Sequence, residues 1–445
     1  MLRWMQSITA KVLGIGLLAL LMLVPLSQSD GLVRERQEMR ATAAARVADG
    51  WGGPQSLGGL VLAVPTRTEV RDSDGKSLGM RDGTEIVLAD ELNTVADLSV
   101  EKRHVGMYEV PVYTGEVTIR GRLLPEDLRR FAAGSTSNWQ MGKAELRLLI
   151  EDTRGLQGIT AFTVDGHSQR LASSTARLGT YTVLSVPMPI DPDRDTPVDF
   201  ALTLRIAGTE SFSVLPLART NTVRLRSAWA DPSFTGFILP GKHSVSAEGF
   251  DAEWKVLDLN RSYGQHWEVT SNDMSERLAS SAFGVTLYQP GSVYQQNDRA
   301  GKYGLLFIAL TFVAFFLFEV LKGLRLHPVQ YLLVGAAMAS FYVLLLALSE
   351  QIGFGLAYVA ASAAVVLIVG GYATAVLRAR GAGMTLGGVL ALVYAILYGL
   401  IGAEQYALLI GSVVLVAVVA LLMYLTRRID WYAYGVPLNP TPDTP

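Results

Sequence analysis

The sequence predicts a polytopic α-helical membrane protein, with about six transmembrane helices and a large, mostly antiparallel β domain outside the cytoplasm. Three observations lead to this fold class: apolar runs of spanning length near both ends of the chain, period-two alternation between them, and one-sided loop charge. The composition agrees, since half of the 445 residues are hydrophobic and the mean hydropathy is +0.30. An ordinary soluble enzyme is less apolar.

The first apolar run covers residues 8–26 and contains a single charge, Lys11. Its length fits a transmembrane helix. A cleaved signal peptide also fits, because the start is basic and Ser27-Gln28-Ser29 has a small-x-small form. Both interpretations stay open at this point. A charged helix is expected to follow over residues 31–48 and to end at Gly50, Gly52 and Gly53.

The middle of the chain, about residues 57–289, alternates apolar and polar residues. Phe200, Leu202, Leu204 and Ile206 are one example, and residues 250–256 repeat the pattern. This spacing indicates half-buried strands. Acidic and glycine-containing turns such as Asp72-Ser73-Asp74-Gly75 separate the runs. A mostly antiparallel β domain is therefore expected, with a short helix beginning at Pro125.

After Lys302 the chain becomes apolar again, in five runs that are each near the length needed to cross a bilayer. These runs cover residues 303–321, 329–348, 352–377, 386–401 and 406–426. The expected organisation is a first transmembrane helix over 1–28, a β-rich domain with a leading helix over 29–302, a five-helix bundle over 303–428 and a cytoplasmic tail over 429–445.

Loop charge predicts the orientation, because Lys and Arg in short loops resist translocation. Basic residues lie at the start of the first span, between the second and third, between the fourth and fifth, and after the sixth; they are Arg3, Lys11, Lys322, Arg325, Arg378, Arg380, Arg427 and Arg428. The alternate short loops, around Glu350 and Glu404, have none. The β domain is therefore expected in the periplasm, with both termini in the cytoplasm.

Composition also excludes several classes of function. The absence of cysteine rules out disulfides and thiolate-bound metals. A net charge of −2 argues against a nucleic-acid partner. The five histidines never approach metal-ligand spacing, so no metal, cofactor or catalytic set is expected.

Three acidic residues are the candidate polar points of the membrane part. Glu319 lies inside a predicted span, where carboxylates are costly and often functional. An exposed pair with Lys322, one turn further on, would also account for it and is the favoured explanation. Glu350 and Glu404 lie beside outer span ends, where they either meet in one vestibule or are simply solvated.

Segments along nearly the whole chain resemble the CreD family of bacterial inner membrane proteins, and they occur in the family's order. The clearest are Gly53-Pro54-Gln55, Tyr113-Thr114-Gly115, Ser227-Ala228-Trp229, Asp231-Pro232-Ser233-Phe234, Phe318-Glu319, His327-Pro328, Gln330-Tyr331-Leu332-Leu333-Val334-Gly335 and Asp430-Trp431-Tyr432-Ala433. The resemblance implies a role in cell-envelope integrity, colicin tolerance and the response to envelope stress, including β-lactams. It implies no known reaction and no site residues.

The leading functional hypothesis is therefore a non-enzymatic protein of the inner membrane that maintains the envelope. Its partners would be the lipid bilayer and an envelope protein or peptidoglycan. The first alternative is transport or lipid handling through Glu319, Glu350 and Glu404. The second is a periplasmic cell-wall hydrolase, for which Asp251, Glu253 and His266 are the nearest acidic and basic neighbours.

Overall fold

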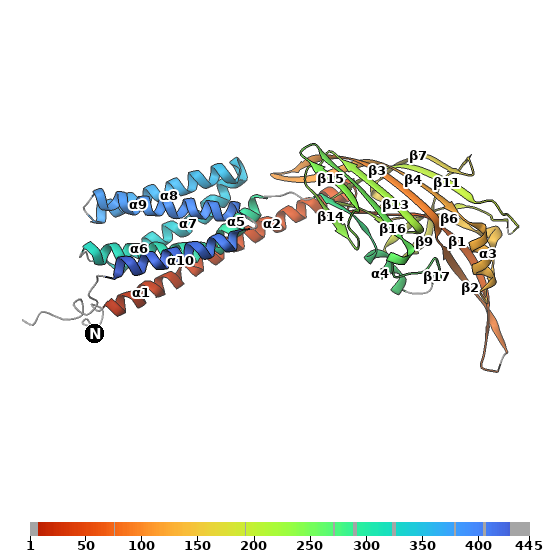
Figure 1. Cartoon of the computed structure of the whole chain (residues 1–445), viewed down its shortest axis with the longest axis horizontal. Helices are drawn as coiled ribbons and strands as arrows, with labels where there is room; N and C mark the ends of the chain where they lie inside the picture. Colours follow the sequence, from red (N-terminus) through yellow and green to blue (C-terminus); the bar gives the residue numbers. More distant parts are fainter. Residues whose placement is uncertain are drawn as a thin grey trace, which may run out of the picture. The chain divides into compact units, whose positions relative to one another are not determined.

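The computed structural model describes residues 8–74, 76–191, 193–269, 272–287, 292–322, 326–377, 380–403 and 406–427. The chain divides into two compact units (Figure 1). Unit 1 comprises residues 1–39 and 291–445, and unit 2 comprises residues 40–290. Each unit has its own hydrophobic core.

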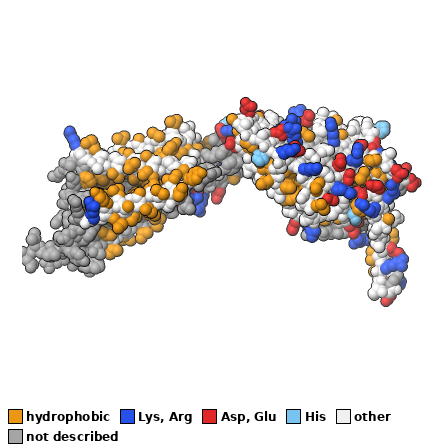
Figure 2. All heavy atoms as spheres, in the orientation of Figure 1, with side chains coloured by type: hydrophobic (Ala, Val, Ile, Leu, Met, Phe, Trp, Pro, Cys, Tyr) orange, Lys and Arg blue, Asp and Glu red, His pale blue; other side chains and the backbone are white. Residues whose placement is uncertain are grey.

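Unit 1 is helical. Its elements are α1 (Ile8–Leu21), the first part of α2 (Leu23–Trp51), α5 (Val293–Lys302), α6 (Gly304–Lys322), α7 (Pro328–Ile352), α8 (Phe354–Leu377), α9 (Arg380–Gly402) and α10 (Ala407–Thr426). Among the described residues, five helices are long and apolar enough to span a membrane, and α5 with α6 adds a sixth, bent by 46°. On the face drawn in Figure 2, hydrophobic side chains are spread over the coloured part of these helices. The prediction of about six spans is confirmed.

The N-terminal helix is longer than the sequence pattern suggested. The expected first span and the expected charged helix follow each other with only Met22 between α1 and α2, and α2 continues to Trp51. Residues Ala10–Trp51 therefore qualify as one helix of 42 residues. The helix ends where predicted, because Gly52 has a φ of +111°, which the α-helix does not allow.

Unit 2 is built from two β-sheets. The first, sheet I, has the order β14-β18-β12-β1-β6-β10-β9, and β2, β5 and β17 extend it beside β1; the second, sheet II, has the order β15-β16-β13-β3-β4-β11-β7-β8. Neighbouring strands are antiparallel except for the pairs β1–β12 and β3–β13.

The strands of sheet I are β1 (Gln55–Arg71), β2 (Ser77–Val87), β5 (Asn138–Trp139), β6 (Glu145–Ile150), β9 (Ala172–Leu178), β10 (Tyr181–Pro187), β12 (Ser211–Leu215), β14 (Pro232–Gly236), β17 (His266–Glu268) and β18 (Phe283–Leu287). Those of sheet II are β3 (Ala89–Val105), β4 (Tyr108–Leu123), β7 (Leu156–Val164), β8 (His167–Ser168), β11 (Val198–Thr209), β13 (Ala218–Ser227), β15 (Lys242–Ser246) and β16 (Gly249–Leu257). Helices α3 (Pro125–Ala133) and α4 (Asn272–Ser280) complete the unit.

The predicted alternation is confirmed in the core of unit 2. In β11 the side chains of Phe200, Leu202, Leu204 and Ile206 are buried, and in β16 those of Ala252, Trp254 and Val256 are buried. Side chains from both sheets form one apolar cluster. Because successive side chains of a strand point to opposite faces, each of these strands supplies every second residue to that core. Pro125 begins α3, as expected.

Candidate functional site

A buried carboxylate lies where three helix ends meet in unit 1. Glu319 is in the last turn of α6 and is only 4% exposed. Its Oε2 accepts a hydrogen bond of 2.9 Å from the Tyr331 hydroxyl, and its Oε1 accepts one of 2.8 Å from the main-chain N–H of Leu326. The Lys11 ammonium group forms an ion pair with Oε1. We call Lys11, Glu319 and Tyr331 the polar node.

The sequence around the start of α7 positions Tyr331. Pro328 occupies the first turn, where its missing N–H costs nothing. His327 caps the helix by accepting from the Val329 N–H, and Gln330 reaches back to the His327 N–H. The first turn is thereby fixed, and Tyr331 faces the end of α6. The rings of Phe312 and Phe315 pack edge-on against the Tyr331 ring, at 5.8 and 6.3 Å.

The partner of Glu319 comes from the opposite end of the chain. The sequence favoured an exposed pair with Lys322, but the carboxylate is buried and is bound by Lys11, which lies 308 residues away. The side chain of Lys322 is outside the described residues. Lys11 was the missed residue. The sequence did contain a clue to this pair. Lys11 and Glu319 are lone charges in two apolar runs, and such charges are costly in hydrocarbon unless they pair with each other.

Glu350 takes part in a second polar group, near the other end of α7. Its Oε1 accepts a hydrogen bond of 3.2 Å from the Tyr294 hydroxyl and lies 3.6 Å from Nε of Arg36. Beside it, Asn297 donates a bond of 2.9 Å to the Ser349 hydroxyl. These contacts join α2, α5 and α7.

Glu319 and Glu350, the two candidate acids that the structure describes, do not lie in one site. Glu350 is in the last turn of the 25-residue helix α7 and Tyr331 is in its first, so roughly 30 Å of helix separates Glu350 from the polar node. Glu404 lies outside the described residues.

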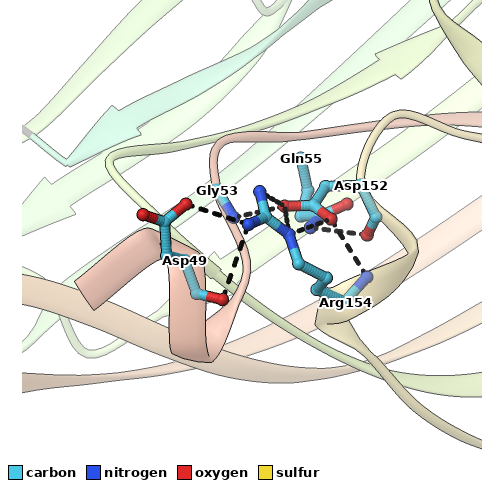
Figure 3. A network of polar contacts seen from close by, with 5 residues as sticks. All are labelled: Asp49, Gly53, Gln55, Asp152 and Arg154. Atoms are coloured by element: carbon cyan, nitrogen blue, oxygen red, sulfur yellow. Dashed lines mark hydrogen bonds and ion pairs between the residues drawn. The ribbon is translucent and has the colours of Figure 1, made fainter. Parts of the chain in front are cut away.

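In unit 2, a polar network holds the end of α2 to the first strand (Figure 3). One Asp152 carboxylate oxygen, Oδ2, accepts from the Gly53 N–H at 2.9 Å and from the Arg154 guanidinium at 2.9 Å. The Arg154 guanidinium also lies 3.0 Å from the carboxylate of Asp49, which is in the last turn of α2. Burial raises the pKa of Asp152, but the hydrogen bonds from Arg154 and Gly53 outweigh it and leave the pKa below the ordinary value. The network forms the joint between the last turn of α2 and β1, within unit 2.

The acidic and basic residues of the hydrolase alternative are not brought together. Asp251 is in sheet II and binds Arg224, with 2.9 Å between Nε and Oδ1, and Glu253 lies 3.9 Å from Lys242. His266 is in sheet I, where its Nδ1 lies 3.6 Å from the buried Glu85. Burial raises the pKa of Glu85, and attraction to His266 offsets only part of that effect.

A cleft of about 380 Å³ opens between α3 and the β5 segment, beside the Glu85–His266 pair. Leu128 and Arg129 line one side, and Trp139 and Met141 line the other. The Phe131 ring stacks on His266 at 4.2 Å. Within the described ranges, no group of three His, Asp or Glu side chains is placed to hold a metal ion.

Comparison with known proteins covers both units. The sequence model of a family described as Inner membrane protein CreD matches residues 7–432. A relative from Escherichia coli strain K12, the Inner membrane protein CreD, is 34% identical over 421 residues, which represent 94% of this chain and 92% of the relative.

Proposed function

The chain belongs to the CreD family of inner membrane proteins, and from this premise we propose that it maintains the cell envelope through binding rather than catalysis. The observation that carries the proposal is the place of unit 2 in the chain. It folds about its own core, and both of its chain ends lead into helices of unit 1. A folded body inserted between two membrane helices is suited to present a recognition surface at the membrane.

The proposal places unit 2 in the periplasm and the termini in the cytoplasm. The support is the restriction of Lys and Arg to alternate short loops, since these residues set orientation whereas long domains cross largely regardless of charge. In that location the partner of unit 2 is an envelope protein or peptidoglycan. The expected phenotypes are altered tolerance to β-lactams, detergents and colicins.

Photocrosslinking in living cells tests the proposed contact. A photoreactive phenylalanine derivative would replace Leu78 or Leu259 of unit 2, which are 66% and 87% exposed. Leu356 and Leu367 of α8 are matched controls, because they are 69% and 74% exposed on an apolar membrane helix. We expect discrete adducts with an envelope component from unit 2 and none of the same size from α8. Absence of adducts across the surface of unit 2, in cells whose envelope defect the variants still complement, would refute the proposal.

A second candidate function, transport or lipid handling, is favoured by the buried charge of Glu319. Ionisable residues inside a membrane often mark a pathway. Replacing Glu319, Glu350 and Glu404 together by Gln would then abolish the envelope phenotype. If the triple variant folds and complements a deletion strain fully, transport through these residues is excluded and the binding function is supported.

A further inference from the structure

We propose that the Lys11–Glu319 ion pair, completed by Tyr331, locks the first helix into the membrane unit, so that this helix stays in the mature protein instead of being removed as a signal peptide. This proposal concerns assembly and does not depend on the proposed function. It rests on three features of the described residues: helix packing, the state of the cleavage-like segment, and the charge balance at Glu319.

The N-terminal helix is packed into the core of unit 1. Met22 and Leu26 are 3% and 5% exposed and belong to the same apolar cluster as Phe312 and Tyr342. Two glycines make this approach close. A Cβ built on Gly335 would lie 2.8 Å from Sδ of Met22, and one on Gly304 would lie 2.9 Å from a methyl carbon of Leu26. Helices pack tightly in membranes where small residues allow it. One face of the helix is thus packed against the bundle, while Leu13 and Leu17 outside that face are 65% and 68% exposed.

The segment that resembles a cleavage site is folded into a helix. Ser27-Gln28-Ser29 lies inside α2, so its main chain is helical rather than extended. The Ser29 side chain is 6% exposed and its hydroxyl donates to the Pro25 carbonyl at 3.0 Å. The Ser27 hydroxyl donates to the Val24 carbonyl at 2.8 Å. Cleavage would require this turn to unwind and Leu26 to leave the core.

Charge balance makes the first helix necessary to the bundle. Lys11 is the one cation paired with Glu319 among the described residues. Without it, the carboxylate would keep, within the part of the chain that the structure describes, only the Tyr331 hydroxyl and the Leu326 N–H as partners. A buried charge that loses its counterion is strongly destabilising, more so in hydrocarbon. The ion pair therefore fixes α1 against the ends of α6 and α7.

Epitope tags at both ends of the full-length chain test retention directly. We expect both tags on one membrane-bound band of full length, at all times after synthesis. Appearance of a shorter mature form that carries only the C-terminal tag would overturn the proposal.

A set of charge-neutralising variants tests whether the Lys11–Glu319 ion pair holds the first helix in place. The variants are K11M, the double variant K11M/E319Q, and V12M as a matched control on the exposed neighbour Val12 (47% exposed). We expect K11M to lower the yield of monodisperse, detergent-solubilised protein by roughly fivefold or more, because it strands the carboxylate. The uncharged amide introduced by E319Q can still accept from the Leu326 N–H through its oxygen and donate to the Tyr331 hydroxyl oxygen through its NH2 group, so the double variant should recover most of the yield. V12M should match the wild type.

Two outcomes of the cycle would overturn the lock. One is a K11M yield equal to that of V12M, which would mean that Lys11 does not contribute to the mature bundle. The other is a double variant no better than K11M, which would mean that the two charges act independently.

Discussion

At the scale of single residues, the sequence identified the costly groups but not their partners. Glu319 stands out in its apolar run, and so does Lys11 in the first run. Their pairing depends on helices that are adjacent in space and 308 residues apart in sequence. Periodicity carries no information on such contacts. The same limit explains why Asp251, Glu253 and His266 looked like neighbours although both acids lie in sheet II and His266 lies in sheet I.

Removing the Tyr331 hydroxyl should weaken the membrane unit. Y331F deletes the 2.9 Å bond to Glu319 while keeping the ring contacts with Phe312 and Phe315. We expect a loss of about 1.5–3 kcal/mol in stability, the usual value for a hydrogen bond to a charged group. Thermal denaturation in detergent, followed by size-exclusion chromatography, measures it. Y398F is the control, since Tyr398 is 47% exposed; equal losses in both variants would count against the node.

Glu85 should make unit 2 less stable as the pH rises. Burial raises its folded-state pKa above the ordinary 4.5, with His266 lowering it and Glu268 raising it to smaller extents. The folded state therefore binds the proton of Glu85 more tightly than the unfolded state does. The contribution of Glu85 to the free energy of unfolding is greatest below pH 4.5 and falls as the pH rises through the folded-state pKa.

The variant E85Q tests this sign. Its stability relative to the wild type should increase with pH above about 4.5, because only the wild type then bears a buried charge. Tryptophan fluorescence during unfolding by denaturant, measured at several pH values, gives the difference. A difference that stays constant with pH would contradict the argument.

At the scale of elements, strands and spans followed from periodicity and length, whereas their junctions did not. The alternation of residues 200–206 predicted β11, and apolar runs predicted α6 to α10. The continuity of the N-terminal helix was not predicted, because the composition changes from apolar to charged within it and each half fits a separate helix. Its end at Gly52 was predicted from the glycines, but the Asp152 network that holds this end to the sheet was not.

The joint between α2 and β1 offers a matched glycine pair. Gly52 has a φ of +111°, and a Cβ there would lie 2.7 Å from the Gly155 Cα. Gly50 is helical, and a Cβ built on it would have no atom within 4 Å. G52A should therefore cost at least about 1–3 kcal/mol through backbone strain alone, whereas G50A should gain up to about 1 kcal/mol of helix propensity.

Denaturant unfolding of the two variants, monitored by circular dichroism, gives both values. Equal stabilities for G52A and G50A would show that the joint does not need a positive φ. A loss confined to G52A would support its role as the fixed connection between helix and sheet.

At the scale of the whole molecule, the fold class and the family were accessible from sequence, because membrane spans and alternating strands leave strong patterns. The order of strands in the two sheets was not accessible. β1 pairs with β12, and β3 pairs with β13, in parallel across more than a hundred residues of chain, and no local pattern specifies such pairings.

The central claim is that unit 2 lies outside the cytoplasmic membrane while the basic loops lie inside. The chain has no cysteine, so single cysteines can be introduced at Ser173, exposed in β9, and at Gly381, exposed near the start of α9. Labelling of intact spheroplasts with a membrane-impermeant maleimide should modify S173C at once, and G381C only after the membrane is permeabilised. Labelling of G381C but not S173C in intact spheroplasts would contradict the account.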